Sequence, residues 1–316
     1  MDVHELVSNF WDLSITGLAQ GAIYALFALG YTLVYGVLRL INFAHSEVFM
    51  VGTFAAILTW NAFGKDTNSA IPGFVAVIGL LLIALLAAAL ASAATAVAVE
   101  RLAYRPLRRR NAPPLAFLIT AIGASTAISE AVGVWTNRNP KGTPSLIHQK
   151  VQFHLFDANV TNLQIGIVLL ALVMMVALDL FINRSRLGLG VRAVAQDPDT
   201  AALMGVNKDR VIGLIFVIGG LMAGVAAVMY VLKIGNTRYD AGFMLGIKAF
   251  AAAVLGGIGN LRGALLGGFL LGVIENWGSA LFGTQWINVV AFVALIIILL
   301  FRPTGLLGES LGKARA

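Results

Sequence analysis

Residues 74–112 read FVAVIGLLLIALLAAALASAATAVAVERLAYRPLRRRNA, an uncharged apolar run followed by an arginine-rich connection. The apolar part, 74–99, exceeds the roughly 20 residues that a helix needs to cross a bilayer. Lys and Arg gather in cytoplasmic loops, so the stretch predicts a membrane span that ends on the cytoplasmic side. The arginines of the connection are Arg101, Arg105, Arg108, Arg109 and Arg110.

The composition of all 316 residues supports a membrane protein. Hydrophobic residues make up 59% and charged residues 12%, with a mean hydropathy of +0.87. A soluble domain carries about a quarter charged residues, so this chain has too little polar surface for water. The net charge of +7 fits basic cytoplasmic loops rather than a nucleic-acid partner. The absence of cysteine excludes disulfides, thiolate metal sites and thiol nucleophiles.

Apolar segments of span length recur along the whole chain. We expect an all-α polytopic integral membrane protein with about nine transmembrane helices, within a range of eight to ten. Three of the segments are short enough to be broken, re-entrant or shielded by neighbours: 43–60, 243–258 and 285–301. The nine segments are 14–36, 43–60, 74–99, 115–135, 163–183, 211–232, 243–258, 263–282 and 285–301.

The distribution of basic residues predicts the orientation. Counting spans from the arginine-rich connection places 184–210 in the cytoplasm, together with the tail that holds Arg302, Lys313 and Arg315. The N-terminus then lies outside and the C-terminus is cytoplasmic. The longest external connection, 136–162, is too short for a separate domain. We therefore predict one transmembrane domain over residues 1–316.

Glycines spaced four apart predict close helix packing. Such pairs occur in GLAQG (17–21), GLMAG (220–224) and twice within 263–272. Small residues at this spacing let helix backbones approach where lipid supplies no hydrophobic drive. They indicate either tight packing or a sliding surface. The two pentapeptides are a weak sign of an internal repeat.

Polar side chains inside predicted spans form the first group of candidate site residues. They are costly in lipid and call for a functional hypothesis. Three interpretations remain open: a satisfied buried ion pair, the lining of a polar pathway, or snorkelling at the lipid edge. Lys248 could neutralise Glu130 or Glu275. The candidates are Asn42, His45, Glu47, Glu130, Lys248 and Glu275.

The pattern of these residues does not predict catalysis. His45 and Glu47 are two residues apart, so they cannot form a metal pair at helical i, i+4 spacing, whereas Asn42 and His45 share a helix face. The chain has no Walker A sequence and no recognised hydrolase motif. We expect no metal, no cofactor and no enzymatic activity in this chain.

The cytoplasmic stretch LGLGVRAVAQDPDTAALMGVNKDRV (187–211) forms the second group. Its DPDT sequence is typical of a helix start, and Gly205 can end that helix. The stretch is either a short helix that docks onto a cytoplasmic partner or an ordinary loop. We name residues 187–210 the coupling segment. Its candidate contact residues are Arg192, Asp197, Asp199, Ala201, Ala202, Gly205 and Arg210.

Three blocks of the sequence resemble one protein family. GLAQGAIYALFALGYTLVYGVLRLINFAHSEVFMVG (17–52), RAVAQDPDTAALMGVNKDRV (192–211) and GIKAFAAAVLGGIGNLRGALLGGFLLGVIEN (246–276) are similar to LivH-type branched-chain amino-acid permeases of ABC importers. Ser46 stands where family members often have Gly. Ala201, Ala202 and Gly205 resemble the EAA loop of ABC permeases, with the alanines one residue closer to the glycine.

The resemblance implies a function and a set of partners. The chain would translocate branched-chain amino acids (Leu, Ile, Val), or related small amino acids and amides, across a bacterial plasma (inner) membrane. Its partners would be a second, LivM-like permease, two cytoplasmic ATPases similar to LivG and LivF, and an extracytoplasmic binding protein. ATP and Mg would bind to the ATPases, and no nucleic acid is implied. The alternative is an ion-coupled secondary transporter or channel that uses His45 and intramembrane carboxylates.

Overall fold

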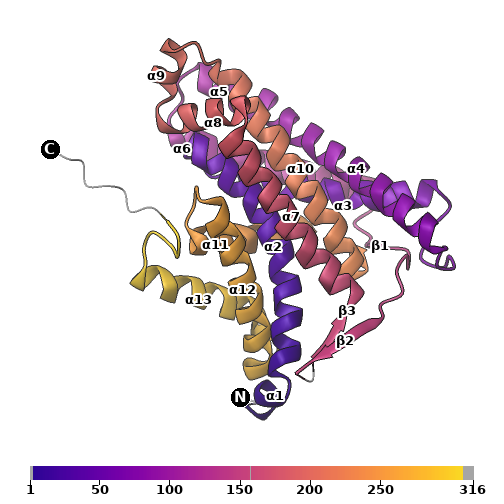
Figure 1. Cartoon of the computed structure of the whole chain (residues 1–316). Helices are drawn as coiled ribbons and strands as arrows, with labels where there is room; N and C mark the ends of the chain where they lie inside the picture. The colour runs from indigo at the N-terminus through magenta and orange to yellow at the C-terminus, as the bar shows by residue number, and fades with distance from the viewer. Residues whose placement is uncertain (1–2, 157, 309–316) are drawn as a thin grey trace. The chain divides into compact units, whose positions relative to one another are not determined.

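The computed structural model describes residues 3–156 and 158–308, so Lys313 and Arg315 of the tail lie outside the described residues. Every predicted apolar segment is a helix (Figure 1). The nine are α2 (Phe10–Leu38), α3 (His45–Ala62), α4 (Phe74–Val99), α6 (Pro114–Trp135), α7 (Asn162–Arg184), α10 (Lys208–Ile234), α11 (Ala241–Gly256), α12 (Leu261–Phe282) and α13 (Ile287–Phe301).

The described part of the chain has seven helical stretches that are long and apolar enough to cross a membrane. α4 continues through the π-helical turn η1 (Glu100–Tyr104) into α5 (Arg105–Arg109), and the 3-10 turn η2 (Thr284–Trp286) precedes α13. α3, with 18 residues, and α11, with 16, are not among the seven. Both correspond to segments that the sequence marks as short. The all-α membrane fold is confirmed, whereas the count of nine and the orientation stay predictions.

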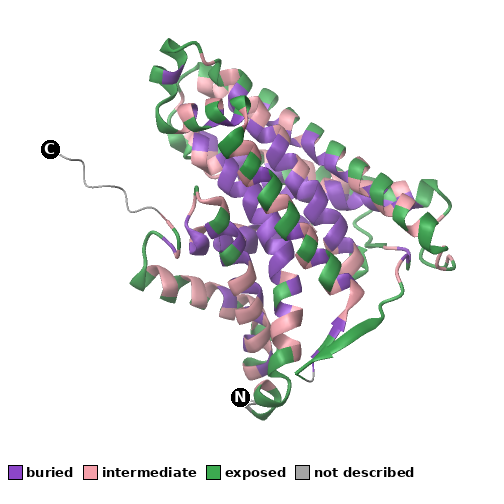
Figure 2. Ribbon diagram, in the orientation of Figure 1, coloured by how far each residue is buried: buried purple, intermediate pink, exposed green. Residues whose placement is uncertain are grey.

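The helices divide into two compact units. Unit 1 takes its described residues from 1–32, 149–177 and 248–316, and unit 2 comprises 33–148 and 178–247. α2, α7 and α11 each contribute residues to both units. Exposed positions recur along α4 (Figure 2). Those on one face carry large apolar side chains, which are unfavourable in water and suit contact with lipid. They include Ile78, Leu82, Leu86 and Leu90.

Unit 2 is centred on the packing of α3, α4 and α10. A side chain at Gly224 would place its Cβ 2.5 Å from the carbonyl oxygen of Ala88, and one at Gly220 would come within 2.6 Å of Ala93 Cα. The missing side chains therefore let α10 touch the backbone of α4. The second glycine pentapeptide is a site of close packing.

Unit 1 uses the first pentapeptide in the same way. A Cβ at Gly17 or Gly21 would meet the backbone of α12 at Val273 and Gly268, at 2.7 and 2.5 Å. The turn between α11 and α12 passes through Gly257 and Gly259, whose φ angles of +106° and +96° favour glycine. Asn260 then caps α12 by accepting hydrogen bonds from the backbone N–H groups of Arg262 and Gly263.

The long connection 136–162 holds short strands that the sequence did not predict. In unit 1, β2 (Val151–Leu155) and β3 (Ala158–Thr161) form an antiparallel hairpin. In unit 2, β1 (Lys141–Gly142) pairs with β4 (Asn236–Thr237), nearly a hundred residues away. A two-residue strand leaves no alternation pattern, so only the long-range pairing defines it.

Candidate functional site

The coupling segment is built from two helices, where the sequence predicted one. α8 (Arg186–Gln196) begins at Ser185, whose hydroxyl accepts a hydrogen bond from the backbone N–H of Gly188. α9 (Pro198–Leu203) follows after a single residue. The missed helix, α8, carries Gly188 tightly against the carbonyl oxygens at the end of α7. The additional helix leads directly into the start of α9, because Asp197 is both the last cap of α8 and the first cap of α9.

The predicted start of α9 is confirmed in detail. The Asp197 carboxylate accepts hydrogen bonds from the backbone N–H groups of Asp199 and Thr200, at 2.9 and 3.1 Å, and from the Thr200 hydroxyl at 2.6 Å. These bonds, led by that from the Thr200 hydroxyl, lower the pKa of Asp197. The carboxylate therefore stays charged where it complements the helix N-terminus.

The far end of α9 presents apolar side chains to the surroundings. Ala201 is buried, whereas Ala202 is exposed, and Leu203 and Met204 are 87% and 81% exposed. Gly205 ends the helix with a φ of +87°. Exposed leucine and methionine at the tip of a well-capped helix form a surface suited to a partner protein.

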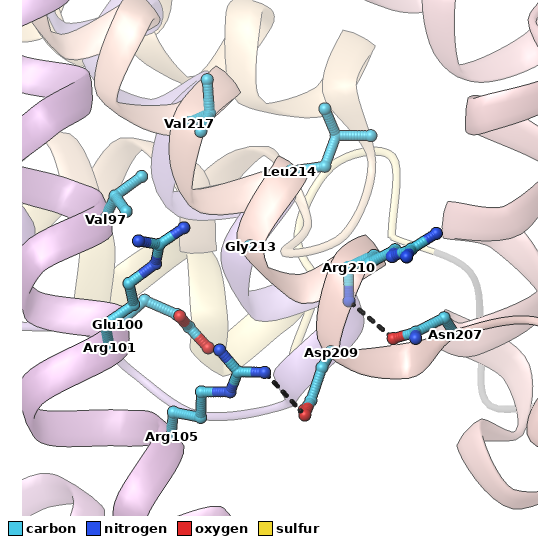
Figure 3. Close-up of a pocket in the computed structure, with 10 residues that line it drawn as sticks. All are labelled: Val97, Glu100, Arg101, Arg105, Asn207, Asp209, Arg210, Gly213, Leu214 and Val217. Carbon is cyan, nitrogen blue, oxygen red and sulfur yellow. Dashed lines mark hydrogen bonds and ion pairs between the residues drawn. The ribbon is translucent and has the colours of Figure 1, made fainter.

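The two arginines of the segment have different environments. Arg192 is exposed and donates to the backbone and side-chain oxygens of Asn183 at the end of α7, at 3.4 and 3.2 Å. Arg210, in the first turn of α10, lines a pocket of about 440 Å³ within unit 2 (Figure 3). The other lining residues are Val97, Glu100, Arg101, Arg105, Asn207, Asp209, Gly213, Leu214 and Val217.

The polar candidates at and just before the start of α3 lie in the interior of unit 2. Asn42 Oδ1 accepts a hydrogen bond of 2.9 Å from the Tyr104 hydroxyl. His45 is 2% exposed at the start of α3. Ser46, the departure from the family pattern, donates to the backbone oxygen of Phe43 and to Glu47 Oε1, at 2.6 and 3.2 Å.

Glu47 is a deeply buried carboxyl group held only by hydroxyl groups. It is 1% exposed, and its Oε1 accepts from Ser46 and from Ser125 of α6, each at 3.2 Å. Its Oε2 is buried and has no hydrogen-bond partner among the described residues. No cation lies within ion-pair distance of Glu47 in that part of the chain. Burying a carboxylate without a partner is costly, so this carboxyl group must either bind a proton or be neutralised by a positively charged group from outside the fold.

Unit 1 holds a buried ion pair. Lys248 Nζ of α11 lies 2.9 Å from Glu275 Oε1 of α12, and the two side chains are 10% and 1% exposed. The Tyr24 hydroxyl of α2 donates to Glu275 Oε2 at 2.6 Å. The Lys248 ammonium also lies over the Tyr24 ring, 5.8 Å from its centroid. Three helices therefore share one neutralised polar contact.

Glu130 is the candidate that the structure places elsewhere. It is exposed near the end of α6 and pairs with Arg138, three residues beyond that helix. The Glu130 side chain is therefore exposed rather than buried, whereas its place inside a membrane span stays a prediction. Of the two partners suggested for Lys248, the structure selects Glu275.

Sequence reasoning missed the hydroxyl groups that hold these buried polar side chains. Tyr24, Tyr104 and Ser125 contact Glu275, Asn42 and Glu47 across 251, 62 and 78 residues of chain. A single tyrosine or serine in an apolar span carries no local signal of a polar partner. Only the tertiary contact distinguishes these residues from ordinary packing.

The fold and these sites define a class: a polytopic helical membrane protein with a buried polar interior and a structured polar connection between spans. Residues 13–300 match a family described as the permease component of the branched-chain amino acid transport system. The chain belongs to this family of ABC importer permeases. As such it is a multi-pass protein of the plasma (inner) membrane.

Individual relatives agree with this assignment over nearly their full length. The permease BraD of Pseudomonas aeruginosa, of a high-affinity branched-chain amino acid transport system, is 44% identical over 96% of this chain and 97% of its own. LivH of Escherichia coli is 41% identical over 95% and 96%. A probable LivH of Methanocaldococcus jannaschii is 24% identical over 96% of each chain.

Proposed function

We propose that this chain forms the membrane pathway of an ATP-driven importer for leucine, isoleucine and valine, or for related small amino acids and amides. The observation that carries this is the match to BraD and LivH, which are named as permeases of branched-chain amino acid transport systems, over more than nine-tenths of each chain. The buried polar groups of α3 supply what a pathway for a zwitterionic solute requires in an apolar protein.

ATP hydrolysis takes place on partner subunits in this proposal. The chain contains no P-loop sequence, and the capped helix α9 with exposed Leu203 and Met204 offers a rigid surface for a cytoplasmic ATPase. A second, LivM-like permease and two ATPases similar to LivG and LivF complete the assembly. An extracytoplasmic binding protein delivers the substrate.

We assign different roles to the buried carboxyl groups. Glu47, with a buried oxygen and no cation beside it, is the candidate to meet the ammonium group of a passing amino acid. Asn42 and His45 lie within the same few residues of chain and are also buried. Lys248 and Glu275 neutralise each other and serve as a structural contact.

The decisive experiment is uptake of labelled leucine by proteoliposomes that contain the purified assembly. ATP and Mg are enclosed, and the binding protein is added outside. We expect uptake to require both ATP and the binding protein, and to persist when ion gradients are collapsed. Uptake driven by an ion gradient without ATP would instead establish the secondary transporter.

A further inference from the structure

The pocket beside Arg210 has walls of two kinds. Its charged residues lie where α4 passes into η1 and α5 and where α10 begins, at the ends of two candidate spans. Its apolar residues, Val97, Leu214 and Val217, lie deeper in the same helices. Figure 3 shows the Arg101 side chain running toward this apolar side, while Arg105 reaches across to Asp209. A ligand here would meet a cationic end and an aliphatic end.

The acidic residues of the pocket are already neutralised. Glu100 Oε1 lies 3.0 Å from Arg108, and Asp209 is bound by Arg108 at 2.8 Å and by Arg105 at 3.2 Å. Neither Arg101 nor Arg210 has a carboxylate within ion-pair distance among residues 3–156 and 158–308. The pocket therefore has an excess of positive charge.

A buried donor points to a missing acceptor at this place. The Nε of Arg105, which lines the pocket, is buried without a hydrogen-bond partner in the described part of the chain, as is one terminal nitrogen of Arg108, which lies outside the lining. Buried N–H groups in native proteins are nearly always satisfied, by protein, water or ligand. Guanidinium groups bind phosphate oxygens through paired hydrogen bonds, so a phosphate is a suitable acceptor.

We propose that this pocket binds an anionic phospholipid. Its phosphate would contact Arg101 and Arg105, and the start of an acyl chain would lie along Val97, Leu214 and Val217. The ends of two spans are the depth at which lipid headgroups sit, and basic pockets between spans on the cytoplasmic side bind anionic headgroups. A free phosphate or an acidic partner protein would leave the apolar wall unused.

Gly213 provides a test that leaves the charges unchanged. A Cβ at this helical glycine would meet nothing within 4 Å, so Gly213→Leu projects into the pocket without a backbone clash. Gly166 in α7 is likewise helical and open and lies outside the pocket lining, which makes Gly166→Leu the matched control. Arg101→Gln removes a pocket charge, and Arg110→Gln removes one from the same connection outside the lining.

Binding is measured by native mass spectrometry of the full-length chain in mild detergent, titrated with dioleoylphosphatidylglycerol, dioleoylphosphatidylcholine or inorganic phosphate. We expect phosphatidylglycerol to bind most tightly. We expect Arg101→Gln to weaken it about fivefold and Gly213→Leu by at least as much, with both controls within about twofold of wild type.

Three results would overturn the proposal. If phosphatidylcholine bound as tightly as phosphatidylglycerol, the negative charge of the lipid would not contribute to its recognition. Full competition by inorganic phosphate, with Gly213→Leu unaffected, would identify a free-phosphate site. Unchanged lipid binding in Arg101→Gln and Gly213→Leu, combined with loss of ATPase co-purification, would identify the pocket as a protein-docking surface.

Discussion

Units 1 and 2 both pack helices through the same kind of glycine pair, yet they treat a buried carboxyl group in opposite ways. In unit 1, Glu275 is neutralised by Lys248 and accepts a hydrogen bond from Tyr24. In unit 2, Glu47 is held by two serine hydroxyls and keeps one buried oxygen without a partner. In the first arrangement an ion pair neutralises the carboxylate within the fold. In our proposal a proton, an ion or a substrate does so in the second, so burial alone does not identify a pathway residue.

Unit 2 also differs in carrying the coupling segment. Ala202→Arg, which adds bulk and charge to the exposed face of α9, should abolish ATP-driven uptake and co-purification of the ATPases, while leaving the amount of folded permease unchanged. The measurement is a pull-down paired with leucine uptake. Ala70→Arg, the same change at an exposed position in the loop before α4, is the control. Retention of the ATPases and of full uptake in Ala202→Arg would remove α9 as the docking surface.

The largest expected effect on stability is in the ion pair of unit 1. Lys248→Ala leaves the Glu275 charge buried and uncompensated, which costs about 3–5 kcal/mol. The free energy of unfolding, measured by SDS titration of the protein in micelles, should fall by that amount. Adding Glu275→Gln should restore part of the loss, because the stranded charge is removed. A Lys248→Ala protein as stable as wild type would mean that the pair is not buried as described.

Substitution of a close-packed glycine should lower the free energy of unfolding to a similar extent in the two units. Gly21→Val and Gly224→Val each drive a side chain into the backbone of a neighbouring helix. Overpacking of this kind costs about 3 kcal/mol, since a backbone cannot move aside as a side chain can. Gly123→Val, at a helical glycine with open space around it, should cost less than about 1 kcal/mol. SDS titration measures the free energy of unfolding of all three variants. If Gly21→Val or Gly224→Val were as stable as wild type, the glycine pair would indicate a sliding surface rather than tight packing.

Glu47→Gln provides the sharpest contrast with the ion pair. No cation is stranded by this change, so we expect the free energy of unfolding to fall by no more than about 1 kcal/mol. Uptake of leucine should nevertheless drop at least tenfold if the carboxylate receives the substrate ammonium, since a charged hydrogen bond is worth about 1.5–3 kcal/mol. Normal uptake together with a large loss of stability would show that Glu47 has a structural role. The buried carboxyl groups of the two units would then have the same role.

The smallest perturbation tests the predicted orientation. The chain has no cysteine, so Arg110→Cys beyond α5 and Asn139→Cys beyond α6 each introduce a single reactive thiol at an exposed site. Stability should not change measurably. A membrane-impermeant maleimide should label Asn139→Cys in intact spheroplasts, and Arg110→Cys only after lysis. The opposite pattern would invert the topology and place the coupling segment outside.

The sequence by itself determined the long apolar helices and the start of α9. Length, apolarity and capping residues act within a few positions, so α4 and the Asp197 cap of α9 could be predicted without the fold. The strands of the long connection and helix α8 were missed, because long-range pairing and packing define them. Tertiary structure alone chose Glu275 over Glu130 as the partner of Lys248 and brought Ser125 to Glu47. The reason is geometric. The helix faces that meet are those whose backbones can approach closely. A contact between residues far apart in the chain produces no periodic pattern in the sequence.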